Sequence, residues 1–168
     1  MNEGLKMFSF LKKKKEDIKR ELKAYVTGEV ITIEEVGDGV FSEKILGEGM
    51  AIWPQDGRLY APADAKVVTV MDDSKHACGL ELEGGIQILL HIGLDTVELN
   101  GEGFKLHVNE GQNVKSGELL IEFDRDVIKA KGYKDVVILA VVENNDGCTL
   151  EMNTGCCVTA KENVIITY

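Results

Sequence analysis

The chain has 168 residues, of which 29 are acidic and 19 are Lys or Arg, so its formal net charge is −10. This length suffices for one domain with a sizeable core. The acidic balance argues against nucleic acid as a partner, because phosphate binding needs a basic surface. No apolar run approaches the ~20 residues that a membrane-spanning helix requires.

The four cysteines show no disulfide or zinc framework, since their spacing matches neither a CxxC pair nor a zinc finger. The apolar run over residues 7–11 is too short for a signal peptide. We therefore expect reduced thiols in a cytoplasmic protein. The sequence assigns no role to Cys148, Cys156 or Cys157.

The first 23 residues are basic. Eight basic and four acidic side chains give them a charge of +4, which leaves −14 for the rest. A sparse apolar stripe predicts a helix over residues 6–23. This leader is either frayed and solvated or an amphipathic segment that touches an anionic membrane surface. We divide the chain into leader 1–23 and domain 24–168.

The rest of the chain is typical of an all-β protein. Glycines punctuate short runs that are rich in β-branched residues, and turn signals recur about every ten residues. The predicted strands cover 30–33, 66–70, 80–82, 119–123, 136–142 and 164–167, with a short helix over 124–131. This pattern predicts an antiparallel β-sandwich or flattened barrel. The turn at 110–120 resembles those of hammerhead-type carrier domains, but their carrier-lysine motif is absent.

Residues 85–97 carry the clearest strand pattern. The even positions from 86 to 94 are Ile or Leu, which predicts one buried face. His91 falls on the opposite face, beside a glycine and an aspartate. A histidine placed this way is either a satisfied core residue or a chemical group.

A hairpin before this strand brings a second histidine close. With Gly84 and Gly85 as a two-residue loop, His91 lies opposite Cys78, and His76 sits on the diagonal, about 7–8 Å away at the backbone. We expect both rings on an open sheet surface. The same register puts Leu80 and Leu82 on the histidine face, and a three-residue loop would change the relative faces.

Two histidines alone allow three interpretations. They form half of a zinc site, an acid/base pair, or a phosphoryl carrier with a hydrogen-bonding support. His107 follows a glycine-rich turn without a partner in sequence, and we interpret it as a surface histidine.

Residues 85–97 resemble the phosphorylation-site signature of glucose-family enzyme IIA, a component of the bacterial sugar phosphotransferase system. Residues 40–52, 60–64 and 97–104 resemble further blocks of that family in the same order. The resemblance covers about residues 24–123. It implies that His91 accepts a phosphoryl group, derived from phosphoenolpyruvate, from the histidine-containing phosphocarrier protein. His91 then passes it to the cysteine of a glucose-family IIB domain in a separate membrane IIBC permease.

The resemblance also implies supporting roles. His76 would stabilise the phosphoryl group, and Ser74 is the candidate for orienting the His76 ring. Gly93 would leave room for the phosphoryl group. For partner binding we expect acidic residues that attract a basic donor and an apolar docking collar. The acidic residues are Asp38 and Asp95, and the collar residues are Val40, Phe41 and Leu89.

Two other functions remain open. The first is a regulatory module whose phosphorylation state controls permeases or metabolic enzymes, in which zinc could join His76, His91 and a partner carboxylate. The second is a non-catalytic β domain that carries a carbohydrate or cofactor. We expect no obligatory cofactor, a monomer, and a cytoplasmic location, either free or peripheral at the inner face of the membrane. The sugar cannot be read from this chain.

Overall fold

The structure is a computed structural model that describes residues 19–168. Almost all of its regular structure is antiparallel strand, with two 3-10 turns, η1 (Glu34–Val36) and η2 (Thr96–Leu99), and one helix, α2 (Arg125–Ala130). The strands are β1 (Glu21–Lys23), β2 (Gly28–Thr32), β3 (Gly49–Pro54), β4 (Arg58–Tyr60), β5 (Ala65–Val70), β6 (Ala77–Leu82), β7 (Ile86–Ile92), β8 (Phe104–Leu106), β9 (Asn113–Val114), β10 (Leu119–Phe123), β11 (Val137–Asn144), β12 (Glu151–Met152), β13 (Cys157–Val158) and β14 (Val164–Thr167).

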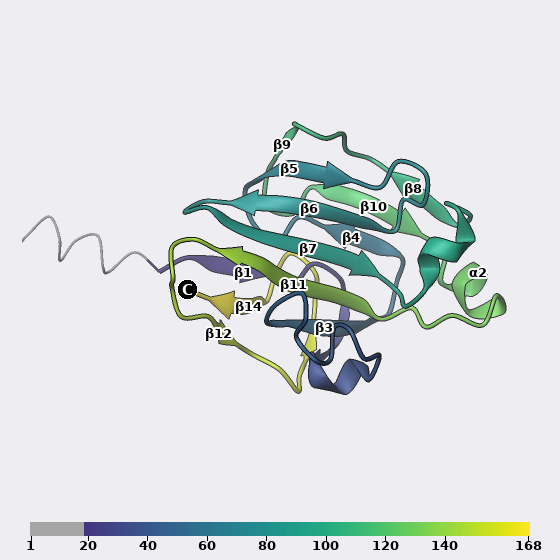
Figure 1. The fold of residues 1–168 in the computed structure, drawn as a ribbon, viewed down its shortest axis with the longest axis horizontal. Coiled ribbons are helices and arrows are strands. Elements are labelled where there is room, and N and C mark those ends of the chain that lie inside the picture. Colours follow the sequence, from purple (N-terminus) through teal and green to yellow (C-terminus); the bar gives the residue numbers. More distant parts are fainter. Residues whose placement is uncertain (1–18) are drawn as a thin grey trace, which may run out of the picture.

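The strands form a β-sandwich. An eight-stranded sheet runs in the order β13-β2-β3-β11-β7-β6-β5-β9, and two three-stranded sheets have the orders β4-β10-β8 and β1-β14-β12. Figure 1 shows β5, β6, β7, β11 and β3 side by side, with α2 at one end of the molecule and the C-terminus at the other. Within residues 19–168 the large sheet is open, with β13 and β9 at its edges. The all-β sandwich is confirmed, and the strands do not close into a barrel.

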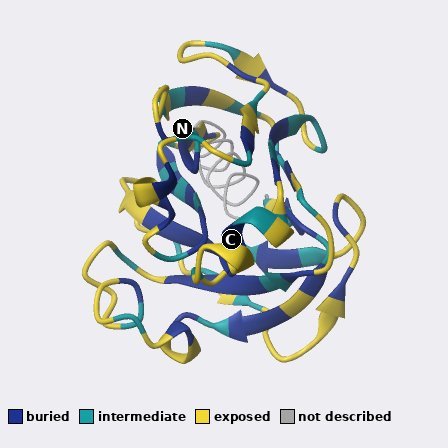
Figure 2. Ribbon diagram, turned by 90° about the vertical axis from the view of Figure 1, so that its right-hand side faces the viewer, coloured by how far each residue is buried: buried dark blue, intermediate teal, exposed yellow. Residues whose placement is uncertain are grey.

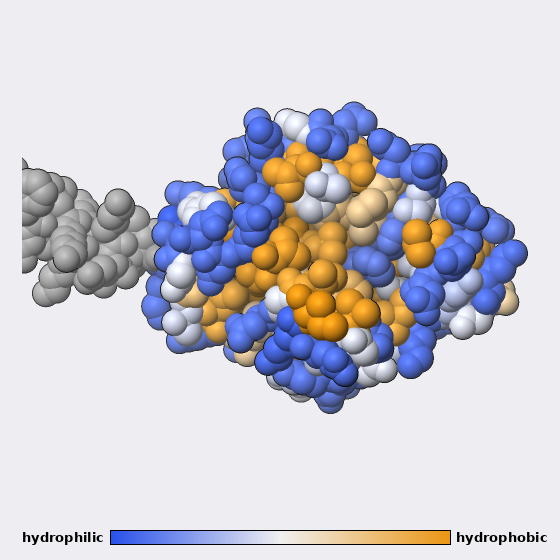
Figure 3. All heavy atoms as spheres, viewed as in Figure 1, coloured by the Kyte–Doolittle hydropathy of each residue, from blue (hydrophilic) through white to orange (hydrophobic). Residues whose placement is uncertain are grey.

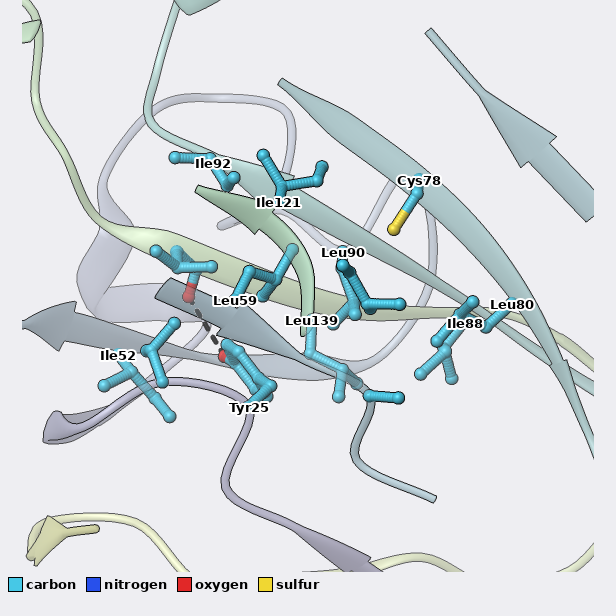
Figure 4. Packing of buried hydrophobic residues seen from close by; sticks show 14 of the residues in the cluster. Tyr25, Ile52, Leu59, Cys78, Leu80, Ile88, Leu90, Ile92, Ile121 and Leu139 are labelled. Carbon is cyan, nitrogen blue, oxygen red and sulfur yellow. Dashed lines mark hydrogen bonds between the residues drawn. The ribbon is translucent and has the colours of Figure 1, made fainter. Parts of the chain in front are cut away.

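The predicted alternation along β7 is confirmed. Its residues alternate between buried and half-buried from Ile86 to Ile92. The buried side chains pack against the small β4-β10-β8 sheet, where Leu59 and Ile121 lie among Ile88 and Leu90 (Figure 4). Figure 2 shows the buried residues along the strands and many of the exposed ones on the loops. The opposite face of β7 carries Gln87, Leu89 and His91.

The predicted two-residue hairpin loop is wrong. The ladder pairs Ala77 with His91 and Cys78 with Leu90, so the loop is one residue longer than the two glycines. This register turns Leu80 and Leu82 into the core, where both are buried. A one-residue slip would move them to the outer face, so burial of these leucines selects the longer loop.

One of the two helix predictions is confirmed, and the other is wrong where the structure describes it. The helix expected over 124–131 is confirmed as α2, whose N-terminus is capped by the Asp124 carboxylate, an acceptor for the N–H groups of Asp126 and Val127. The helix expected over 6–23 is wrong at Glu21–Lys23, which form β1 and pair with β14. Leu22, only 1% exposed, anchors that strand in the core. The remainder of this predicted helix, up to residue 18, lies outside the described residues.

Between residues 19 and 168, no helix has both the length and the apolar character needed to cross a membrane.

Tyr25 provides a test of the core. Its buried hydroxyl donates a hydrogen bond of 3.0 Å to the Val137 carbonyl oxygen (Figure 4). We expect Tyr25→Phe to lower the free energy of unfolding by about 1–2 kcal/mol, because the buried carbonyl loses its donor. Urea denaturation measures this change. The control is Tyr168→Phe at a half-buried tyrosine, expected to change stability by less than about 0.5 kcal/mol. Equal effects of the two substitutions would contradict this account.

Candidate functional site

Two imidazole rings meet at one end of the large sheet. The ring centroids of His76 and His91 are 4.7 Å apart, and the ring planes are nearly perpendicular at 86°. The predicted convergence of the two histidines is therefore confirmed, although by a different route. His76 precedes β6 and lies opposite Ile92, whose N–H donates to the His76 carbonyl. Lys75, just before it, adopts a left-handed conformation (φ 55°). The His76 side chain therefore does not have to follow the alternation of faces that holds within β6.

His76 is buried, which corrects the expectation of two rings on an open surface. Its exposure is 5%, and Ser74 beside it is also buried. The Lys75 N–H donates to the Met71 carbonyl and closes the turn that carries Ser74. His91 alone of the two lines the open depression described below. His76 is therefore shielded from solvent, while His91 is open to it.

Ser74 contacts His76 as predicted. The Ser74 Oγ lies 2.8 Å from the His76 Nδ1. A hydroxyl can donate to or accept from this nitrogen, and in either case the contact restrains rotation of the ring. The distal Nε2 of His76 is left for another partner.

The pKa values of both site histidines are lowered, so the protonated, positively charged form of each ring is disfavoured. Burial, followed by the neighbouring His76, lowers the pKa of His91 to about 4, against the smaller opposing effects of the Gly93 backbone and the Asp38 carboxylate. Burial also lowers the pKa of His76. The His91 Nδ1 is buried and lies toward the Gly93 backbone, so Nε2 is the candidate for the nitrogen that faces the depression. At neutral pH this ring offers an unprotonated lone pair.

His91 lies in a depression of about 600 Å³ with a largely apolar wall. The Phe41 ring is buried, and its centroid is 5.0 Å from that of His91. Val40 (45% exposed) and Val97 (48% exposed) stand at the rim, and Leu46 and Leu89 also line the wall. Figure 3 shows hydrophobic side chains gathered across the middle of one face of the molecule, within a hydrophilic margin.

The predicted collar residues are thus brought together at His91, and the sequence interpretation missed further apolar residues of the wall, among them Leu46, Leu94 and Val97. Leu46 and Val97 lie in segments of the family resemblance, but neither has a periodic pattern that marks it as exposed. Their exposure as large apolar residues depends on how the loop before β3 and the η2 turn are placed around the depression.

Asp38 and Asp95 both line the depression, as expected. Partial burial opposes ionisation of Asp38, but hydrogen bonds from the backbone N–H groups of Ser42, Phe41 and Val40 outweigh it, so the pKa of this carboxyl is lowered. Asp38 therefore stays charged and orders the loop that carries Val40 and Phe41. Asp95 is exposed at the start of η2.

The structure gives Gly93 a packing role. Gly93 is buried and has a φ of +77°. A side chain there would collide with Thr96, and its Cβ would lie 2.8 Å from the Lys134 carbonyl oxygen. The absent side chain therefore makes room for the chain itself.

The remaining candidates lie apart from this site. Cys78 is buried on the core side of β6, and burial raises the pKa of its thiol to about 12, so it is a packed residue and no nucleophile at neutral pH. His107 is exposed, as predicted, and its Nε2 lies 2.7 Å from Glu122. The described residues contain no group of three or more His, Cys, Asp or Glu side chains that could hold a metal ion.

Two comparisons with known proteins are informative. Residues 20–147 match the family model for the phosphoenolpyruvate-dependent sugar phosphotransferase system, EIIA 1. The fold is similar to that of the glucose permease IIA from Mycoplasma capricolum, with a TM-score of 0.81 and 36% sequence identity. That alignment covers 90% of this chain and 96% of the other.

The pKa of His91 can be tested directly. An NMR titration of the imidazole protons should show a His91 midpoint near 4, well below the usual value of about 6.5. The ring then stays neutral as the pH falls from 8 to 5, because burial penalises the cation. The spectrum of His91→Gln identifies the resonance. A midpoint at or above 6 would show that burial does not control this ring.

Proposed function

Because this chain belongs to the EIIA 1 family of the phosphoenolpyruvate-dependent sugar phosphotransferase system, we propose that His91 is its phosphoryl-carrying residue. The proposed donor is the phosphohistidine of the histidine-containing phosphocarrier protein, and the acceptor is the cysteine of a glucose-family IIB domain in a membrane permease. The observation that carries the proposal is a neutral His91 ring in an apolar depression, 4.7 Å from a second imidazole.

The chemical step requires one nucleophilic nitrogen. The lone pair of the His91 Nε2 attacks phosphorus in line with the donor nitrogen. The new P–N bond forms as the P–N bond to the donor breaks, and the electron pair of the broken bond returns to the donor ring. Onward transfer repeats this exchange, with a cysteine thiolate as nucleophile and His91 as leaving group. Little covalent help is needed, since positioning and charge stabilisation dominate phosphoryl transfer.

His76 supports the transferred group in this proposal. A neutral imidazole donates from Nε2 only if its Nδ1 is unprotonated. The Ser74 hydroxyl lies 2.8 Å from Nδ1. When this hydroxyl donates a hydrogen bond to Nδ1, it selects the tautomer that carries its proton on Nε2. The His76 Nε2–H can then donate to a phosphoryl oxygen on His91. Because the ring is buried and restrained, little reorganisation accompanies the transfer.

The surface around His91 suits transient docking of the partner proteins. Exposed apolar residues surround the depression, while Asp38 and Asp95 add negative charge. Apolar contacts exclude water from the phosphoryl group, and the acidic residues speed encounter with a basic donor. Docking should therefore weaken as ionic strength rises.

Labelling with radioactive phosphoenolpyruvate and the purified general components tests the assignment. We expect His91→Ala to take up no label, because the acceptor nitrogen is lost. His76→Ala should take up label at His91 but pass it to a IIB domain at least about tenfold more slowly, as expected for loss of one transition-state donor. His107→Ala, a histidine on another surface, is the matched control and should behave as wild type. Label that persists without His91 would refute the assignment.

The role of Ser74 is tested by a pair of substitutions. Ser74→Ala should slow transfer to the IIB domain several-fold, because the His76 ring loses its restraint and its preferred tautomer. Ser74→Thr retains the hydroxyl and should restore most of the rate. Single-turnover transfer from labelled protein measures both variants. Equal rates for the alanine and threonine variants would show that the hydroxyl does not act through His76.

A further inference from the structure

The wall of the depression that contains His91 also carries a cation. Gly132, Tyr133 and Lys134 line the same depression as His91. Among the described residues that line it, Lys134 is the only one with a positive charge, while Asp38 and Asp95 are negative. Both histidines are held neutral by burial. A phosphoryl dianion on His91 would therefore face two carboxylates, with Lys134 as the single countercharge at the wall.

The backbone of this segment is tied to the turn that follows His91. The Gly93 N–H donates to the Val136 carbonyl at 2.7 Å, and the Leu94 N–H donates to the Lys134 carbonyl at 3.1 Å. The missing side chain of Gly93 allows this close approach, because a Cβ there would lie 2.8 Å from the Lys134 carbonyl oxygen. Lys134 is thus held beside the phosphoryl site by main-chain contacts.

The neighbouring carboxylate does not neutralise Lys134. Asp135 is 3% exposed and turns toward α2, where the Arg125 Nε lies 2.7 Å and the Lys129 Nζ 3.6 Å from its carboxylate. Within residues 19–168, Lys134 makes no ion pair, and its side chain is exposed. A lysine ammonium on a flexible four-carbon stem can reach a phosphoryl oxygen as a point charge.

From this arrangement we propose that Lys134 contacts the phosphoryl group carried by His91 and stabilises the phosphorylated protein. The inference rests on the proposed function of His91. The positive charge of Lys134 attracts the phosphoryl group and favours its retention on His91. The same charge repels the basic donor protein and therefore weakens docking of the unphosphorylated donor. These two effects have opposite signs, which distinguishes electrostatic contact from a structural role.

The equilibrium between this protein and the phosphorylated donor tests the proposal. We expect Lys134→Gln to reduce the equilibrium constant for transfer to His91 by about five- to tenfold, as for loss of one charge-assisted contact, and to bind the unphosphorylated donor slightly more tightly. Lys134→Arg, which retains the charge, should stay within about twofold of wild type. Phosphorus NMR at equilibrium measures the constant, and calorimetry measures donor binding.

Lys131→Gln is the matched control. It removes the same charge three residues earlier, from a side chain whose Nζ is 3.7 Å from Glu102, and should leave the equilibrium unchanged. An unchanged equilibrium in Lys134→Gln, or an equal loss in Lys131→Gln, would overturn the role of Lys134. If wild-type protein accepts no phosphoryl group, the proposed function of His91 itself fails.

Discussion

Leu80 and Leu82 of β6 pack on the same side of their hairpin as Ile88 and Leu90 of β7, in the core beneath the large sheet. Burial of these side chains sets the register of the two strands, because a shift of one residue would expose them. The register in turn places His91 on the outer face, opposite Ala77, and leaves His76 at the point where β6 begins. The position of the reactive ring therefore follows from the packing of residues that never touch it.

The site combines two neutral imidazole rings with charged side chains in the surrounding wall. Burial withdraws protons from both imidazoles, which keeps a nitrogen lone pair available near neutral pH. The same burial makes a transferred dianion costly unless hydrogen-bond donors and cations meet it. In the proposed function, the groups that would offset that cost are His76, oriented by Ser74, and Lys134. In the same proposal, the apolar rim would allow a partner to cover the site and exclude water.

Two segments that are distant in the sequence are connected next to His91. The turn after β7 and the segment before β11 share main-chain hydrogen bonds, and Gly93 permits their close approach. Asp135 connects the second segment to α2 through Arg125 and Lys129. The walls of the depression are in this way anchored to regular structure on two sides, which limits reorganisation during transfer.

The all-β class, the buried face of β7 and the presence of α2 could be predicted from the sequence alone, because each depends on local periodicity or capping. The sequence also identified His91, His76 and Ser74 as candidates through their pattern and the family resemblance. The hairpin loop length, the burial of His76 and the packing role of Gly93 became visible in the three-dimensional structure. That structure alone joined Leu46, Val97 and Lys134 to the site. These features arise where segments far apart in the chain compete for the same space, and no local pattern encodes the outcome of that packing.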